Sequence, residues 1–143
     1  MHVTELLERK GREVYTIEEQ ASIAAAVALM SERGVGALVV RGTEPPLSGI
    51  LSERDVVRRL AETGPWALEE TVGSLMSRTV TVCHESTSCT NLMEIMTDQR
   101  IRHIPVIESG SLVGIVSIGD VVKARVDELE RERRDLLEYV SAR

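Results

Sequence analysis

Apolar and polar residues follow one another along this chain in a pattern that occurs twice. In the first copy a short stretch of β-forming residues, 14–17, precedes a segment in which Ile23, Val27 and Met30 are spaced i, i+4 and i+7. This spacing predicts an amphipathic helix with the three side chains on its apolar face. Ser22 stands directly before that helix, where serine is a favoured N-cap residue.

The second copy begins in the same order. Residues 79–82 form its β-prone stretch, and Cys89, Met93 and Met96 occupy the matching helical positions. Ser88 stands at the predicted N-cap of this helix. We therefore expect each copy to start with a strand and a helix.

Each copy continues with two apolar runs joined by a turn-rich loop, which predicts a β-hairpin. The runs are residues 37–40 and 47–51 in the first copy, and 103–107 and 112–116 in the second. A further helix follows each hairpin, so the predicted order is β-α-β-β-α, twice. A half of about 70 residues buries too little surface to be stable alone. The expected fold class is therefore α/β (α+β), with two repeats packed about a pseudo-twofold axis.

A Gly-x-x-Ser-x-x-Asp segment ends each hairpin and starts the helix that follows. The motif residues are Gly49, Ser52 and Asp55 in the first copy and Gly114, Ser117 and Asp120 in the second. A Ser followed three residues later by an acid is a capping box, and each cap contributes about 1 kcal/mol. That structural interpretation suffices for either motif taken singly.

Three features of the duplicated motif favour a ligand site as well. Both copies keep the glycine, both keep Asp where Glu or Gln is the commoner partner in a capping box, and both lie where a strand end meets a helix N-terminus. A carboxylate can accept hydrogen bonds from both hydroxyls of a ribose. The helix N-terminus favours phosphate.

The last helix is predicted to continue beyond the second repeat. Its apolar positions, with one arginine among them, are Ile118, Val122, Val126, Leu129, Arg133, Leu136 and Val140. The spacing from Val122 onward is typical of a heptad seam, which favours a dimerisation helix over one that lies back on its own domain. We expect three segments: 1–66, the first repeat with an N-terminal segment; 67–126, a linker helix and the second repeat; and 127–143, the helical extension.

Composition and charge exclude several functions. A net charge of −6 over 143 residues argues against non-specific nucleic-acid binding, and one Trp, two Tyr and no Phe nearly exclude a base-stacking platform. No run approaches the roughly 20 apolar residues of a membrane span. Cys83 and Cys89 are too few for a disulfide framework, so a reducing, cytoplasmic location is expected. His103 has no metal-ligand spacing with His2 or His84, and no metal site is expected.

The duplicated pattern with Gly-x-x-Ser-x-x-Asp in each half resembles a tandem pair of CBS domains (cystathionine β-synthase domains), often called a Bateman module. The resemblance covers roughly residues 14–126 and includes the segment 102–106, Arg-His-Ile-Pro-Val, before the second motif. The chain looks like the small stand-alone bacterial form. The resemblance implies a regulatory module that binds AMP, ADP, ATP, NAD or S-adenosylmethionine between the repeats and has no catalytic cofactor.

In the family each motif Asp holds ribose hydroxyls, while strand residues of the opposite half surround the base. Carried over, the first site consists of Asp55 and Ser52 at the ribose, with Thr81, Val82 and Ile104 near the base. The second consists of Asp120 and Ser117 at the ribose, with Thr16, Ile17, Gly36 and Ala37 near the base. Arg102 and His103 are expected to contact phosphate, and Arg54 is a second candidate.

The two sites are expected to differ, because the first copy has Gly36-Ala37 where the second has Arg102-His103. At most one of them should bind a phosphorylated nucleotide tightly. We expect occupancy to be relayed to a regulated partner or a homodimer interface. The alternative is a scaffold or dimerisation protein with non-functional nucleotide pockets, in which the motifs serve only as caps.

Other side chains receive simpler interpretations. Arg58 and Arg59 are expected on a solvated helix face, and Cys83 and Cys89 as small buried hydrophobes. Thioredoxin-linked plant relatives of the family leave a redox role for these cysteines open. Enzyme activity is not expected, because no nucleophile with a base and an orienting group is evident.

Overall fold

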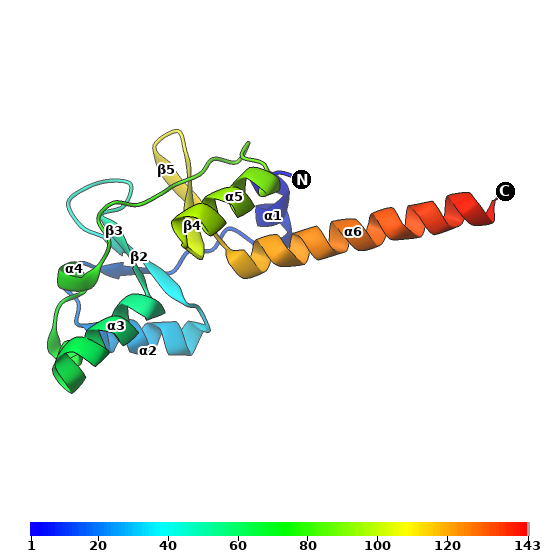
Figure 1. The fold of residues 1–143 in the computed structure, drawn as a ribbon. Coiled ribbons are helices and arrows are strands. Elements are labelled where there is room, and N and C mark those ends of the chain that lie inside the picture. Colours follow the sequence, from blue (N-terminus) through cyan, green and yellow to red (C-terminus); the bar gives the residue numbers. More distant parts are fainter. Residues whose placement is uncertain (143) are drawn as a thin grey trace.

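The computed structural model describes residues 1–142 and shows two small sheets, each with helices packed on it (Figure 1). The elements in chain order are α1 (Val3–Lys10), β1 (Thr16–Glu18), α2 (Ile23–Arg33), β2 (Ala37–Arg41), β3 (Gly49–Ser52), α3 (Glu53–Thr63), the 3-10 helix η1 (Gly64–Glu69), α4 (Val72–Leu75), α5 (Cys89–Gln99), β4 (His103–Glu108), β5 (Ser111–Ser117) and α6 (Ile118–Ser141). The mixed α/β class, the duplication and the long last helix are confirmed.

The first repeat forms the predicted strand, helix, hairpin and helix. β1 pairs in parallel with β2, and β2 pairs antiparallel with β3. The Ser22 hydroxyl accepts a hydrogen bond from the Ala25 amide and caps α2, as expected. We call the buried side chains of this repeat the first core: Ile23, Ala26, Met30, Leu38, Val40, Leu51, Val56, Val72 and Met76.

The second repeat has the hairpin β4–β5 and the capped helix α5, but the strand predicted at 79–82 is wrong. The parallel pairing of β1 with β2 is reduced here to one bridge, between Cys83 and Val106. The Cys83 amide donates to the Pro105 carbonyl (3.0 Å), and the Ile107 amide donates to the Cys83 carbonyl (2.9 Å). The residues before Cys83 run outside the sheet, where 79–81 line a cavity.

The second core lies between α1, α5, α6 and the β4–β5 hairpin. Its buried side chains are Val3, Leu6, Leu7, Cys83, Cys89, Leu92, Met96, Ile104, Val106, Val116, Val121 and Ala124. The apolar faces of α2 and α5 are rotated from those expected, because Val27 and Met93 are each 37% exposed. Ala26 and Leu92, one residue earlier in each helix, are fully buried instead.

Each repeat packs against the helix that precedes the other repeat. The Val72 amide at the start of α4 donates to Ala21 in the first repeat (2.8 Å). The Val3 amide at the start of α1 donates to Thr87 in the second (2.9 Å), at the position matching Ala21. The sequence pattern did not predict α1. Since its three buried side chains belong to the second core, the two repeats share their cores through exchanged helices.

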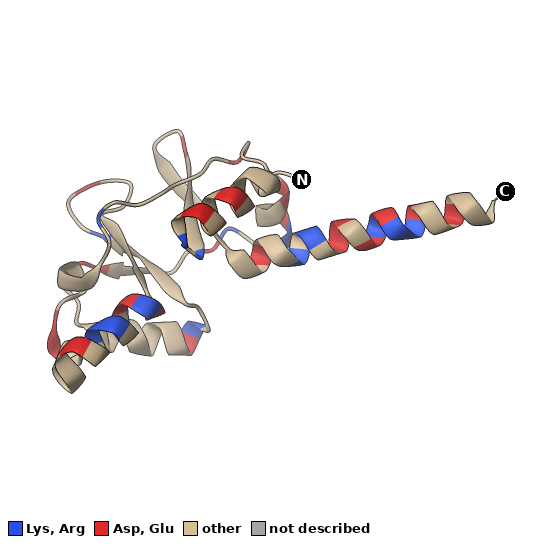
Figure 2. Ribbon diagram, viewed as in Figure 1, with Lys and Arg blue, Asp and Glu red and all other residues tan. Residues whose placement is uncertain are grey.

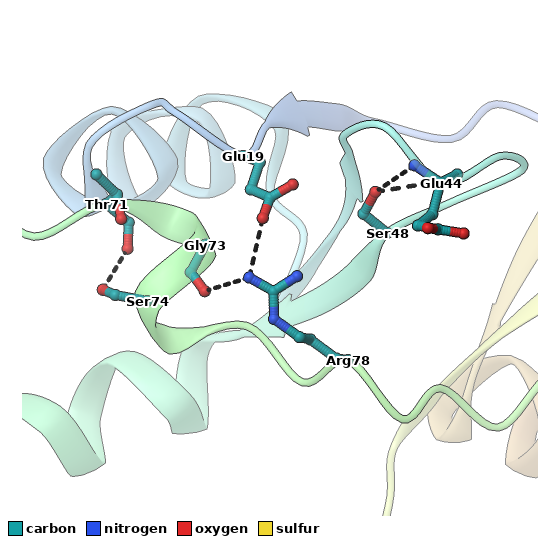
Figure 3. Close-up of polar contacts among 7 residues, drawn as sticks. All are labelled: Glu19, Glu44, Ser48, Thr71, Gly73, Ser74 and Arg78. Atoms are coloured by element: carbon teal, nitrogen blue, oxygen red, sulfur yellow. Dashed lines mark hydrogen bonds and ion pairs between the residues drawn. The ribbon is translucent and has the colours of Figure 1, made fainter.

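An ion pair fastens each exchanged helix to its repeat. Arg78 donates to the Glu19 carboxylate at 2.9 Å and to the Gly73 carbonyl at 3.3 Å, which holds α4 on the first repeat (Figure 3). Arg12 pairs with Glu85, the match of Glu19 in the second repeat. The matching glutamates of the two repeats, Glu19 and Glu85, thus each pair with an arginine that follows an exchanged helix.

Helix α6 leaves the second repeat and projects away from it (Figure 1). Its buried residues, Val121 and Ala124, lie near its start. The heptad positions beyond them are exposed, with Leu129 47% and Val140 66% accessible. Acidic and basic residues alternate along the projecting part (Figure 2). The helix therefore does not lie back on its own domain, and no helix within residues 1–142 is long and apolar enough to cross a bilayer.

Candidate functional site

Both motif aspartates form the predicted capping boxes. In the first, Asp55 Oδ2 accepts from the Ser52 amide (2.9 Å) and hydroxyl (3.0 Å), while the Asp55 amide donates to Ser52 Oγ at 3.3 Å. Within residues 1–142 the other oxygen, Oδ1, accepts no hydrogen bond from the protein. The cap therefore engages one carboxylate oxygen and leaves the second available.

The second motif has an additional partner. Asp120 Oδ2 accepts from the Ser117 amide (2.8 Å) and from Lys10 Nζ at 2.6 Å. Lys10 Nζ also donates to the Ile115 carbonyl at 2.8 Å. Partial burial alone raises the pKa of Asp120, but the hydrogen bonds from Lys10 and Ser117 and the charge of Lys10 outweigh it and lower that pKa below its ordinary value.

A cavity of about 350 Å³ lies between the two repeats next to the first motif. Seven of the predicted site residues line it: Gly36, Ser52, Arg54, Asp55, Thr81, Arg102 and His103. The carboxylate and hydroxyl come from the end of β3 and the start of α3, and the basic side chains come from α3 and the start of β4. Two residues predicted for this site lie elsewhere, because Val82 does not line the cavity and Ile104 is fully buried in the second core.

The residues predicted for the second site are not gathered in the first cavity or in the pocket that contains Asp120. Asp120 lines a separate pocket of about 170 Å³ between α1 and α6, together with Lys10. Ser117, Thr16, Ile17 and Ala37 do not line this pocket, and Gly36 lines the first cavity instead.

Four arginines line the first cavity: Arg54, Arg58, Arg100 and Arg102. None of their guanidinium groups makes a hydrogen bond or ion pair with any of residues 1–142. Arg58 and Arg100 were not among the predicted site residues. In a protein of net charge −6, four cationic side chains without carboxylate partners make this cavity suited to an anionic ligand.

Arg58 and Arg59, expected on one solvated face, have different surroundings. Arg59 approaches Glu62 at 3.8 Å and Glu70 at 3.6 Å, whereas Arg58 lines the cavity. The sequence of α3 alone does not distinguish the surroundings of Arg58 from those of Arg59, because they depend on residues outside the helix, such as Glu70.

Arg100 adopts a left-handed backbone conformation, with φ 55° and ψ 42°, at the end of α5. The matching residue of the first repeat is Gly34, with φ 64° and ψ 37°. Glycine enters this region without strain, and other residues do so at a cost. The second repeat therefore holds an arginine at the cavity in a conformation for which the first uses glycine.

His103 lies beside Gly36 and Glu53 at the boundary between the repeats. A β-carbon added to Gly36 would lie 3.3 Å from His103 Cε1 and 3.2 Å from Glu53 Oε1, so glycine permits this close approach. Burial lowers the pKa of His103 below its ordinary value, and the charges of Lys10 and Arg102 add to this; Glu53 and Asp120 oppose it. The imidazole is therefore neutral near pH 7.

The two cysteines are free and buried. Burial raises the pKa of the Cys83 thiol to about 12 and also raises the pKa of Cys89. Because the thiolate is the reactive form, this environment makes both side chains poor nucleophiles and supports their interpretation as core residues.

The arrangement combines a carboxylate oxygen free to accept hydroxyls, unpaired cations and aliphatic side chains. Ile50, Val80 and Ile101 supply the aliphatic part of the cavity lining. These groups can bind a sugar, phosphates and an apolar ring respectively.

Comparison with known proteins relates the chain to one family. The family model for the CBS domain matches residues 4–62 and 72–127. A CBS domain-containing mitochondrial protein of Arabidopsis thaliana, CBSX3, is 42% identical over 120 residues, which cover 80% of this chain and 58% of the relative. The chain thus spans less than two thirds of that plant relative.

Solved structures show the same fold. A CBS-domain protein from Agrobacterium tumefaciens superposes with a TM-score of 0.85 at 43% identity, covering 87% of this chain and 99% of that one. A CBS domain pair crystallised with 5′-methylthioadenosine and S-adenosyl-L-methionine has a TM-score of 0.78 at 22% identity, covering 90% of this chain and 98% of that one.

Proposed function

This chain belongs to the CBS-domain family, and we propose that it is a regulatory module whose cavity between the repeats binds an adenine nucleotide. CBS-domain pairs are generally regulatory, non-catalytic modules that sense adenosine-containing ligands. A cavity of about 350 Å³ is within the range of roughly 300–1,000 Å³ typical of small-molecule sites.

The observation that carries the proposal is the set of four unpaired arginines around the cavity. Guanidinium groups bind phosphate oxygens through paired N–H donors. S-adenosylmethionine, a ligand of the related crystallised pair, carries a cationic sulfonium that these arginines repel. The cavity therefore favours the polyanionic nucleotides ADP and ATP over S-adenosylmethionine, with AMP and NAD, which carry less negative charge, between them.

The remaining parts of the ligand have matching groups. Asp55 Oδ1 is available for the ribose hydroxyls, with Ser52 beside it. Adenine would lie against Ile50, Val80 and Ile101, since the chain has almost no aromatic residues. Thr81 lines the same cavity, where its hydroxyl bonds to Gln99 at 2.6 Å.

Titration calorimetry with ADP, ATP, NAD, AMP and S-adenosylmethionine tests the proposal. Sensing of cellular nucleotides suits micromolar affinity, about −8 kcal/mol. Arg58→Ala should weaken ADP binding about tenfold or more, since it removes a charge-assisted contact of about 1.5 kcal/mol or more. Arg59→Ala is the matched control, because the neighbouring guanidinium pairs with glutamates outside the cavity. Equal effects of the two variants, or tighter binding of S-adenosylmethionine than of ADP, would contradict the proposal.

We further propose that α6 joins two copies of the chain and that ligand occupancy changes this association or its reading by a partner. A ligand shifts such an equilibrium only when it binds one state better. The exposed heptad seam favours self-association. Truncation after Asp127 should convert a dimer to a monomer in sedimentation. A full-length chain that sediments as a monomer would contradict association through α6.

The alternative function, a scaffold with non-functional pockets, predicts a different pair of results. The truncation would still abolish the dimer, but no nucleotide would raise the melting temperature. Two buried free thiols suit a reducing compartment such as the cytoplasm in either case.

A further inference from the structure

The equivalent motif carboxylates of the two repeats have different neighbours. Asp55 and Asp120 occupy matching positions and form the same capping box. Asp55 faces the open cavity between the repeats, whereas Asp120 is paired with Lys10. The cause of this difference lies in the exchanged helices.

Helices α1 and α4 dock on their repeats at matching points. A β-carbon on Gly49 would meet the Met76 side chain that follows α4, and one on the equivalent Gly114 would meet Leu7 of α1. Val72 and Val3 make matching backbone hydrogen bonds at the helix starts. Both correspondences give the same shift of 69 positions between the two helices.

The same shift aligns Lys10 with Thr79. Helix α4 ends at Leu75, so the chain has left the helix before Thr79, which lines the open cavity. Helix α1 continues to Lys10 and ends there. The longer helix thus carries an ammonium group to the place where the shorter one leaves space.

The backbone contacts at this place are also equivalent. In the first repeat the Ser77 amide donates to the Ile50 carbonyl at 2.9 Å. In the second, the matching carbonyl of Ile115 accepts instead from Lys10 Nζ at 2.8 Å. Lys10 replaces a backbone donor and pairs with Asp120 at once, and its side chain is only 29% exposed.

The position of Lys10 is fixed by the core beneath it. Val3 and Leu7 of the same helix are 0% and 1% exposed in the second core. These anchors fix the backbone of α1 at Lys10. The ammonium group can therefore leave Asp120 only by rotation of the lysine side chain, unless the whole helix is displaced.

We propose that Lys10 is an internal occupant of the second site, so that each chain binds one nucleotide rather than two; this rests on the proposed nucleotide binding in the first cavity. The ammonium neutralises the carboxylate that a second ribose needs. The pocket that remains beside Lys10 and Asp120, between α1 and α6, is about 170 Å³. Within residues 1–142 Asp120 Oδ1 accepts no hydrogen bond, so the obstacle to a second nucleotide is the ammonium group held against the carboxylate rather than the lack of an acceptor oxygen.

The test is the number of ADP molecules bound per folded chain, measured by equilibrium dialysis at saturating ADP. We expect one for the wild type and two for Lys10→Ala, with the second lost again in Lys10→Ala/Asp120→Asn. Lys123→Ala is the matched control, because Lys123 lines the same small pocket without bonding to Asp120; it should bind one. Lys10→Met, which keeps the aliphatic stem, replaces Lys10→Ala if the latter fails to fold.

The outcomes separate the inference from the function on which it rests. One ADP for both wild type and Lys10→Ala would overturn the role of Lys10 and leave the first cavity as a site. No ADP for the wild type but one for Lys10→Ala would overturn binding at the first cavity and support the role of Lys10. Two for the wild type, or none for either protein, would overturn the inference.

Discussion

At the residue scale, the two carboxylate oxygens of Asp55 have different surroundings. Asp55 Oδ2 holds the cap, while Oδ1 accepts no hydrogen bond within residues 1–142. A carboxylate has about four lone-pair sites, so a helix cap and a ribose contact are compatible in one side chain. The capping role of Asp55 therefore does not exclude a role in ligand binding.

The two aspartates should differ in their contribution to stability. Asp55→Ala removes a cap and should lower the free energy of unfolding by about 1 kcal/mol. Asp120→Ala also leaves Lys10 without its carboxylate and should add about 0.5–1 kcal/mol, the range of a partly exposed ion pair. Urea unfolding measures both values. In a Lys10→Met background the additional loss should vanish, and equal losses in the wild-type background would contradict the pairing.

His103 should make anion binding depend on pH. Burial holds the pKa of His103 below its ordinary value of 6.5, so the imidazole of the free protein is neutral at pH 7. A bound phosphate group stabilises the protonated form and raises that pKa, so binding takes up a proton. The affinity for ADP should therefore rise as pH falls from about 8 to about 6.

Calorimetry on the wild type and on His103→Gln isolates this effect, because the titration of the phosphates themselves is common to both proteins. The difference in log affinity between them should grow toward low pH. A difference that does not change with pH would place His103 away from the phosphates.

At the element scale, the glycines of the duplicated motif have a packing role. A β-carbon on Gly49 would lie 2.6 Å from the Ser77 carbonyl oxygen, and one on Gly114 would lie 2.7 Å from Leu7 Cδ2. Both glycines thus let an exchanged helix or its following turn approach a strand closely. Their recurrence, which the sequence interpretation counted in favour of a ligand, is explained by this packing.

Alanine at these glycines should destabilise the two repeats unequally. Overpacking typically costs about 1–3 kcal/mol. Gly49→Ala should lie at the upper end, because it meets a backbone oxygen that cannot rotate away, and Gly114→Ala lower, because it meets the end of a side chain. Gly119→Ala is the control, since its β-carbon has no neighbour closer than 3.6 Å. Urea midpoints give the order, and a larger loss for Gly114→Ala would contradict it.

Elements governed by neighbouring residues were predictable from the sequence. The hairpins, the serine N-caps and both capping boxes depend on residues within a few positions of one another. The prediction of a strand at 79–82 was wrong because β propensity cannot show that this segment reaches β4 only at its end, through the bridge between Cys83 and Val106.

The parts that position the candidate site depend on distant contacts. Lys10 bonds to Asp120, which is 110 residues away, and Arg58 differs from Arg59 only through what surrounds α3. Periodicity reports which face of an element is apolar but not which element covers it. Arg100 did leave a signal, since it stands where the first copy has Gly34.

At the scale of the whole molecule, the exchange of helices means that each core contains a helix that is distant in sequence from the rest of its repeat or precedes the other repeat. The division proposed from sequence places α1 with the first repeat, in 1–66, and α4 with the second, in 67–126. Every residue of the first core lies within 12–76, while the second core needs residues 3–7 from the other end of the chain. A cut at 66 therefore divides both cores.

Fragments of the chain should fold according to the cores they contain. A fragment 1–66 lacks Val72 and Met76 of the first core, and burial of each such side chain contributes about 1.5–3 kcal/mol. Because a small domain has only about 5–15 kcal/mol of net stability, this loss should leave 1–66 largely unfolded. Fragment 12–76, of nearly equal length, contains the whole first core and should show the more cooperative urea transition by circular dichroism.

Mixing fragment 1–66 with fragment 67–143 should restore structure, because each fragment supplies the helix that the other lacks. If 1–66 were the more stable fragment, α4 would contribute little to the first core, and the exchanged helices would not be what unites the repeats.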